Sequence, residues 1–357
     1  MRVDRRGFLA GAGAVALAGP MFGAPALAQP AGLRRLRLGF GFRASNTAVI
    51  NLLIGEPLGY NKEEGFTLSA RPMGTNAAVQ IALDKGELDF GIGVPSFQLP
   101  LYAKGELPPI VNFYEYTYPY KWDIVVPPDS SVRSYDQLKG KKVGVTNFGL
   151  TDYPVTRAVL KSRGIDPDKD VTWVAVGEGI PAGVALQRGV VDALASYDTA
   201  FGQLEGAGMA IRFLPRPTDI PMIGGLHLSC LANTLKNDRR FALGLCRSAA
   251  KATEFVLANP RASVKLFLQM FPDAAPRGVS EDDAIKSLMW GVNRRKELFR
   301  PPYPDTKLGQ IRGEELMLEA QFMDLAIKSV DSLYSNDLIE DANAFDHDKI
   351  RSDAKAA

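Results

Sequence analysis

A lysine- and glycine-rich segment at residues 135–149 (YDQLKGKKVGVTNFG) has the composition of a loop that binds phosphate. A P-loop needs G-x-x-x-x-G-K-[ST] after a strand, whereas the Gly-Lys-Lys at 140–142 precedes the apolar run that would form one. We therefore expect its lysines to lie in a solvated turn before a buried strand. The small polar loop after that strand, residues 146–149, is better placed to contact a ligand.

Few side chains are available for catalysis. The chain has two cysteines and two histidines, Cys230, Cys246, His227 and His347. This supply is too small for an ordinary zinc site, and it disfavours a nucleophile that depends on histidine. We expect no catalytic residue, no metal and no cofactor. The cysteines are expected to be separate core residues, with a disulfide as the alternative in an oxidising compartment.

Polar and aromatic side chains gather instead in loops that follow strand-like runs. Arg43 could pair with a carboxylate or sulfonate, whereas Glu178 would repel an anion and favours a ligand with a donor or cationic group. Arg43 opposed by Glu178 and Asp198 fits an organic solute better than a bare inorganic anion such as nitrate. The candidate ligand-binding residues are Arg43, Ser45, Asn46, Thr75, Asn76, Ser96, Phe97, Tyr116, Thr146, Asn147, Phe148, Glu178, Tyr197 and Asp198.

Each kind of candidate also has an ordinary structural role. Arg43 could be a solvated loop residue. Small polar residues such as Asn46 and Thr75 precede expected helices and could simply cap them. Most aromatic residues in strands belong to the core, although Phe148 or Tyr197 could stack on a ring of the ligand.

An internal repeat shows which elements position these loops. Residues 81–89 (IALDKGELD) align with residues 184–192 (VALQRGVVD) at an offset of 103. Around each copy, apolar strands and helices alternate in the same order, so duplication of a β-α-β-α-β unit is predicted. Ligands of open α/β sheets bind beyond the carboxyl ends of the strands. Two facing units would therefore place their loops around one cleft.

The predicted strands and helices follow from this repeat and from the apolar patterns of the chain. We expect strands at 36–42, 66–72, 89–93, 142–145, 171–176 and 192–196. Helices are predicted at 49–55, 154–163, 237–258, 260–270, 281–298 and 311–332, besides helices that end near Gly86 and Gly189. Residues 117–128 and 222–232 would carry the chain between the units. The C-terminal helices are expected to pack on the first unit.

These elements predict an α/β fold of two lobes. Lobe 1 is expected to comprise residues 29–122 and 230–345, and lobe 2 residues 123–229. Residues 346–357 would form a C-terminal tail. With 357 residues, 46% of them hydrophobic, the chain is long enough for two cores, and its net charge of +2 disfavours nucleic-acid binding.

The first residues predict export. Paired arginines, Arg5 and Arg6, precede a charge-free stretch that ends before Arg34. Such a pattern is typical of a twin-arginine signal peptide, and Ala-Leu-Ala at 26–28 fits cleavage after Ala28. A transmembrane anchor is the alternative, but prolines and glycines make this stretch a poor spanning helix. We therefore expect the mature protein in the periplasm.

Four motifs give the chain a family resemblance. Residues 134–145 (SYDQLKGKKVGV) and 82–93 (ALDKGELDFGIG) resemble segments of periplasmic substrate-binding proteins of ABC importers. The branch is the nitrate/sulfonate/taurine type, which includes NMT1/THI5-like domains. Residues 249–260 (AAKATEFVLANP) and 333–339 (LYSNDLI) are similar to its C-terminal motifs.

The resemblance implies a type II periplasmic-binding fold. Such a protein, expected here as a monomer, would bind a small organic solute, such as a sulfonate, carboxylate or heteroaromatic compound, between its lobes. It would then deliver the solute to a membrane permease that works with an ATPase. One alternative is an enzyme on the same fold, but the cysteine cluster of thiamine-pyrimidine synthases is absent from this sequence. Another is a binding module that feeds a sensor.

Overall fold

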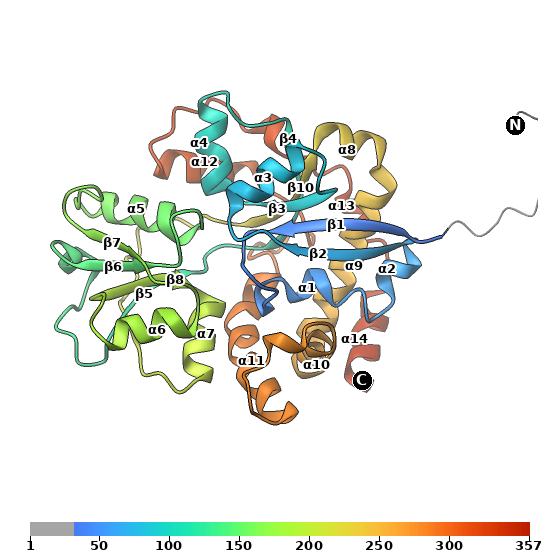
Figure 1. Cartoon of the computed structure of the whole chain (residues 1–357). Helices are drawn as coiled ribbons and strands as arrows, with labels where there is room; N and C mark the ends of the chain where they lie inside the picture. Colours follow the sequence, from blue (N-terminus) through green and yellow to red (C-terminus); the bar gives the residue numbers. More distant parts are fainter. Residues whose placement is uncertain (1–31) are drawn as a thin grey trace, which may run out of the picture. The chain divides into compact units, whose positions relative to one another are not determined.

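The computed structural model describes residues 32–357, so the predicted signal peptide lies outside the described residues. Within them the strands form two five-stranded sheets (Figure 1). The first has the order β2-β1-β3-β10-β4, with β1 at Arg34–Phe40, β2 at Phe66–Pro72, β3 at Phe90–Gly93, β4 at Ile110–Thr117 and β10 at Leu226–Leu231. The second has the order β7-β6-β8-β5-β9, with β5 at Trp122–Val126, β6 at Lys142–Val145, β7 at Thr172–Ala175, β8 at Ala193–Tyr197 and β9 at Arg212–Phe213.

The two sheets are built alike. In the first, β1 pairs in parallel with β2 and β3, and β10 runs antiparallel to β3 and β4. In the second, β6 pairs in parallel with β7 and β8, and β5 runs antiparallel to β8 and β9. This correspondence confirms the predicted fold of two β-α-β-α-β lobes.

The chain passes between the sheets twice. It leaves the first sheet at the end of β4 and enters the second at β5, then returns from β9 to β10. In the first sheet, β10, which follows the second crossing, lies next to β3. In the second sheet, β5, which follows the first crossing, lies next to β8. The two lobes are thus joined by two covalent connections, residues 118–121 and 214–225.

Helices cover both sheets. Those of the first unit are α1 (Ile50–Leu53), α2 (Tyr60–Glu63), α3 (Asn76–Asp84) and α4 (Pro95–Ala103). Those of the second are α5 (Asp152–Ser162), α6 (Ile180–Gln187) and α7 (Asp198–Gly206). The C-terminal part contains α8 (Ala232–Asn237), α9 (Arg239–Ala258), α10 (Pro260–Met270), α11 (Glu281–Arg295), α12 (Gly313–Phe322), α13 (Ile339–Ala342) and α14 (His347–Ala356).

The helix predicted at 311–332 is too long. The observed α12 ends at Phe322, where Leu325 N donates to Ala320 O at 2.9 Å. Asp324 adopts a left-handed conformation with φ 58° inside this turn, so the chain reverses as in a Schellman motif. The helix predicted at 49–55 is also shorter than expected, because α1 ends at Leu53 and α2 begins only at Tyr60.

The C-terminal helices pack on lobe 1 as predicted. Helices α9, α10, α13 and α14 contribute buried side chains to one core together with β1, β3, β4 and β10. Helix α11 also contacts α7 of lobe 2, where a Cβ at Gly202 would lie 2.6 Å from Gly291 Cα. Glycine at both positions therefore permits a close approach between a C-terminal helix and the second lobe.

The cysteines and the hydropathy of the helices complete this description. Cys230 on β10 and Cys246 on α9 are free thiols buried in the lobe 1 core, as the sequence favoured. Across residues 32–357, no helix combines the length and the apolar character needed to span a membrane.

Candidate functional site

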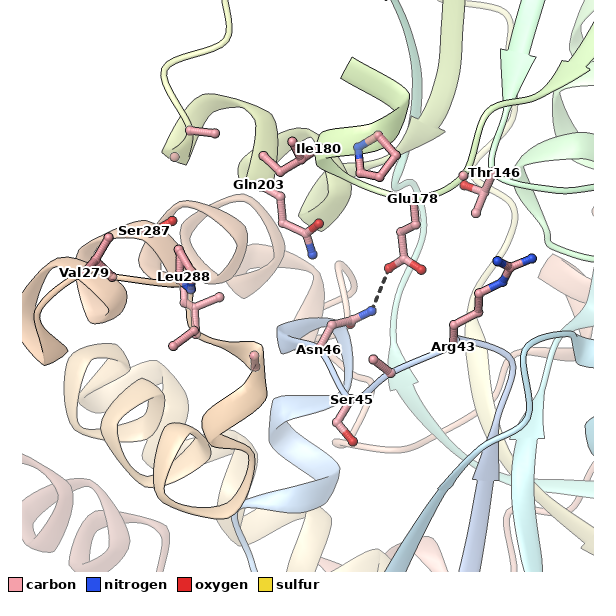
Figure 2. Close-up of a pocket in the computed structure, with 18 of the residues that line it drawn as sticks. Arg43, Ser45, Asn46, Thr146, Glu178, Ile180, Gln203, Val279, Ser287 and Leu288 are labelled. Atoms are coloured by element: carbon pink, nitrogen blue, oxygen red, sulfur yellow. Dashed lines mark hydrogen bonds between the residues drawn. The ribbon is translucent and has the colours of Figure 1, made fainter. Parts of the chain in front are cut away.

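A cleft of about 810 Å³ lies between loops of both lobes and the α10–α11 connection. We call this space the outer cleft; Figure 2 shows its lining side chains. Its polar lining includes Arg43, Ser45 and Asn46 from the loop after β1, Thr146 and Asn147 from the loop after β6, and Glu178 from the loop after β7. The loops that the repeat predicted to face one another thus line one space.

Asn46 and Glu178 link the two lobes at the centre of this cleft. Asn46 Nδ2 donates to Glu178 Oε1 at 2.9 Å, while Asn46 Oδ1 accepts from Ala48 N and caps the next turn (Figure 2). Tyr197 OH donates to the same carboxylate oxygen. Burial raises the pKa of Glu178, although both hydrogen bonds and the charge of Arg43 oppose that rise. The carboxylate is thus held in place by one residue from each lobe.

Arg43 and Thr146 offer donors to a ligand. Arg43 is exposed and lines the outer cleft near its polar end. Thr146 is 5% exposed, and its Oγ1 has no hydrogen-bond partner among the described residues. Asn147 is less available, because its Oδ1 accepts from Gly149 N at 2.8 Å.

The rest of the outer cleft is largely apolar. Ile180 and Pro181 come from the start of α6, whereas Val279 and Leu288 come from the α10–α11 connection and α11. Ile180 and Val279 are 43% and 46% exposed, so this wall offers apolar surface to a ligand. The sequence analysis missed the α10–α11 wall, because its residues lie outside both copies of the repeat.

A second space adjoins the outer cleft at Leu150, which lines both. This inner compartment has a volume of about 30 Å³. It is lined by Gly41, Phe42, Asn76, Ile92, Val94, Tyr116, Lys121, Trp122, Leu150, Thr151, Asp152, Tyr197, Leu226 and Arg295. Aromatic rings and charged groups therefore enclose it together.

Arg295, which lines the inner compartment, forms a buried ion pair with Asp198. Arg295 Nε lies 2.5 Å from Asp198 Oδ2, and Arg295 Nη2 also donates to Asp198 Oδ1. The Arg295 and Asp198 side chains are 1% and 9% exposed. Asp198 is thereby engaged by a protein partner, which the sequence could not show because Arg295 lies 97 residues away.

Lys121 and Asp152 bring two further ionisable groups to this compartment. Lys121 Nζ donates to Gly224 O and lies 3.9 Å from the centre of the Trp122 ring. Burial lowers the pKa of Lys121 to about 7, with a contribution from Arg295. Burial also raises the pKa of Asp152 to about 6, although the hydrogen bond that it accepts from Thr146 N opposes that rise.

The lobes also touch directly beside the inner compartment. Asn76 N donates to Gly149 O at 3.2 Å, and Asn76 Nδ2 donates to Thr151 Oγ1 at 3.3 Å. Both bonds join the start of α3 to the loop after β6. A solute that entered the inner compartment from the outer cleft would therefore be enclosed where the lobes meet.

The predicted site residues fall into three groups. Six of them line the outer cleft: Arg43, Ser45, Asn46, Thr146, Asn147 and Glu178. Three line the inner compartment: Asn76, Tyr116 and Tyr197. The others line neither space: Thr75 caps α3, Ser96 is buried in α4, Phe97 packs on the lobe 1 core, Phe148 lies exposed against Tyr153, and Asp198 pairs with Arg295.

Three charged residues of the inner compartment were not predicted: Lys121, Asp152 and Arg295. Asp152 follows the predicted loop at residues 146–149 by three residues, so its position gave a weak signal. Lys121 lies in the crossing between the lobes and Arg295 in a C-terminal helix, where no motif marks them. Within the described part of the chain, no group of three or more His, Cys, Asp or Glu side chains is placed to hold a metal ion.

Comparisons with known proteins agree with this architecture. A family model described as NMT1/THI5 like matches residues 46–263. The fold is similar to the periplasmic aliphatic sulphonate binding protein SsuA from Escherichia coli, with 18% identity, coverage of 83% of this chain and 95% of that chain, and a TM-score of 0.61. It is also similar to the periplasmic nitrate-binding protein NrtA from Synechocystis PCC 6803, with 13% identity, coverage of 89% and 91%, and a TM-score of 0.64.

An enzyme has the same fold. The desulfurization enzyme DSZB is 15% identical, with coverage of 87% of this chain and 98% of that chain, and a TM-score of 0.55. A search of the curated proteins found no match. At these identities the structural similarities establish the fold, which binding proteins and at least one enzyme share.

Proposed function

The chain belongs to the NMT1/THI5-like family, as its four motifs predicted, and on this premise we propose that it is the solute-binding component of an ABC import system. It binds a small organic solute between its lobes and delivers that solute to a membrane permease that works with an ATPase. The similarity to SsuA and NrtA, which are periplasmic binding proteins, supports this proposal.

The observation that carries the proposal is the position of the two spaces. The outer cleft and the inner compartment are lined by residues of both lobes, and the lobes are joined by two crossings. A solute held there contacts both lobes, so its binding favours the arrangement in which they are close. A cleft of this kind also matches the usual size of small-molecule sites.

The polarity of the outer cleft indicates an organic solute. One part of the lining presents Arg43, Asn46 and Glu178, and another part is built from apolar residues such as Ile180 and Val279. A bare inorganic anion would leave that apolar wall uncovered. We propose a solute with a polar head and an apolar or aromatic body, within the sulfonate, carboxylate and heteroaromatic classes.

We also propose that the protein is exported by the twin-arginine route. Residues 1–28 act as a twin-arginine signal peptide, and the mature monomer works in the periplasm. In a strain without twin-arginine translocation, the protein is expected to stay in the cytoplasm at precursor size. Conversion of Arg5 and Arg6 to lysine in a normal strain is expected to have the same effect. Periplasmic delivery in both experiments would refute the export route.

A second candidate function is an enzyme on the same fold. The similarity to DSZB favours it, but the described cysteines are buried in the lobe 1 core, away from the cleft. Prolonged incubation of a bound compound with the protein separates the two functions. A binding protein returns the compound unchanged, whereas an enzyme converts it.

A thermal-shift screen tests the proposed function. Sulfonates, aromatic carboxylates, carboxamides and heteroaromatic compounds are added singly over a range of concentrations. A ligand present at 100 times its Kd stabilises the folded state by about 2.7 kcal/mol, which corresponds to a rise in Tm of roughly 5 °C. A rise that saturates with concentration supports solute binding, and the absence of any rise across the whole panel contradicts it.

A further inference from the structure

Three buried side chains that line the inner compartment each carry a polar atom without a partner. Tyr116 belongs to β4, Asp152 to α5 and Arg295 to α11, and each is 1% exposed. All three line the compartment. Tyr116 OH, Asp152 Oδ1 and Arg295 Nη1 have no hydrogen-bond partner among residues 32–357.

The remaining polar atoms of Asp152 and Arg295 are already engaged. Asp152 Oδ2 accepts from Thr146 N at 2.6 Å. Arg295 directs Nε and Nη2 to Asp198. These bonds fix both side chains and leave one atom of each free. A buried polar group without a partner costs about 1–3 kcal/mol, so three such groups around one space favour a polar occupant.

The three free atoms differ in chemistry. Arg295 Nη1 only donates hydrogen bonds, Asp152 Oδ1 only accepts when the carboxylate is ionised, and Tyr116 OH can do either. A sulfonate or nitrate only accepts, so it would satisfy Arg295 but would place an oxygen against Asp152. A group that has an acceptor atom next to an N–H donor would satisfy both.

The surrounding charges also disfavour a bare anion. Asp198 offsets the charge of Arg295. Burial lowers the pKa of Lys121 to about 7, so this amine is only partly charged near neutral pH. Asp152 is ionised above its pKa of about 6. The compartment thus provides directional hydrogen bonds but little net positive charge.

We infer that the inner compartment receives the head group of the solute, and that this head carries a hydrogen-bond acceptor beside an N–H donor, as a primary carboxamide does. The inference rests on the proposed function and, among the solute classes proposed there, favours heteroaromatic compounds that carry such a head over sulfonates and carboxylates. A cavity needs about 10–15 Å³ to hold one water, so 30 Å³ admits a head of two or three heavy atoms. The body of the solute extends past Leu150 into the outer cleft.

Matched ligands test this inference. Benzamide, benzoate and benzenesulfonate share a phenyl body and differ in the head, and butanamide, butyrate and propanesulfonate likewise share a propyl body. Calorimetry with the full mature chain at pH 7.5 is expected to show that each amide binds at least tenfold more tightly than the sulfonate with the same body. Equal or tighter binding of the sulfonates would overturn the inference.

Asp152→Asn exchanges a pure acceptor for a side chain of the same size that can also donate. The amide oxygen of the new side chain can keep the bond from Thr146 N while the amide nitrogen faces the compartment. The amide ligands are expected to lose about tenfold in affinity and the carboxylates to gain. Asp123→Asn is the matched control, because burial also raises the pKa of Asp123 to about 6 but Asp123 does not line the compartment.

Tyr116→Phe supplies a second variant that keeps the shape of the core. It removes one hydroxyl that has no partner within the described part of the chain, so the fold is expected to persist. The amides should bind several-fold more weakly, whereas unchanged affinity in both Tyr116→Phe and Asp152→Asn would overturn the inference.

The pH supplies a further readout. Below about pH 6 the Asp152 carboxyl becomes protonated and can donate. Benzoate and butyrate are therefore expected to gain more affinity between pH 7.5 and pH 5.5 in the wild type than in Asp152→Asn, because Lys121, with its pKa of about 7, gains charge in both proteins. The same pH dependence in both proteins would contradict the assignment.

The outcomes of these experiments separate the proposed function from the head-group inference. If a sulfonate or another solute binds but Asp152→Asn and Asp123→Asn behave alike, the proposed function stands and the head-group inference is overturned. If neither this ligand series nor the wider screen gives saturable binding, solute binding itself fails and the inference fails with it.

Discussion

The buried ion pair between Arg295 and Asp198 gives a quantitative prediction. It joins α11 of the C-terminal part to α7 of lobe 2 through two hydrogen bonds, one of them 2.5 Å long. Removing one partner of a buried pair leaves an uncompensated charge and costs about 3–5 kcal/mol. Because Asp198 Oδ1 also accepts from Thr199 N at 2.7 Å, we expect Arg295→Met to cost about 3 kcal/mol, near the lower limit.

Urea unfolding followed by circular dichroism at pH 7.5 measures this free energy. Arg294→Met is the matched control on the same helix. Arg294 pairs with Glu205, but their side chains are 29% and 22% exposed. More exposed pairs contribute about 1 kcal/mol or less, so this variant is expected to lose about that amount.

The double variant Arg295→Met/Asp198→Asn identifies the cause. It removes the charge that Arg295→Met leaves behind, so it is expected to recover at least half of the lost free energy of unfolding. If Arg295→Met costs no more than Arg294→Met, or if Asp198→Asn gives no recovery, the buried ion pair does not have the role that we assign to it.

Two other predictions concern the close approach of α11 to α7 and the buried carboxyl of Glu319 on α12. Gly202→Ala is expected to destabilise the protein by about 1–3 kcal/mol, measured by urea unfolding, because the new Cβ would lie 2.6 Å from Gly291 Cα; an unchanged stability would contradict the close approach. Burial raises the pKa of Glu319 to about 7, although Lys121 opposes the rise, so the folded state binds more protons than the unfolded state between pH 4.5 and 7. The contribution of the protonated Glu319 side chain to the free energy of unfolding is fully present below pH 4.5 and is lost as the pH rises through 7. From pH 5 to pH 7.5 the wild type should therefore lose about 2 kcal/mol relative to Glu319→Gln, and parallel pH profiles of the two proteins would refute this assignment.

Local sequence signals predicted much of the fold. The repeated segments at 81–89 and 184–192 predicted two equivalent units, and β2 and β6 have their predicted bounds. Helix α11 begins at its predicted residue, Glu281, where Ser280 and three acidic residues favour a helix start, but it ends at Arg295, three residues before the predicted Leu298. Such features depend on neighbouring residues and can therefore be read from the chain.

Contacts between distant segments could not be predicted in this way. The pairing of Asp198 with Arg295 depends on how α11 lies across α7, which no repeat or motif encodes. The same holds for the α10–α11 wall of the outer cleft. Asp324 adopts a left-handed conformation that is uncommon outside glycine, so the end of α12 carried no ordinary stop signal.

The central claim is that the chain binds a solute between its lobes and does not convert it. The most direct test is a calorimetric titration of the mature protein with the best compound from the thermal-shift screen, followed by mass analysis of the recovered compound. The account predicts saturable binding of one molecule per chain and recovery of that compound unchanged. Conversion of the compound, or no saturable binding of any compound in the panel, would contradict it.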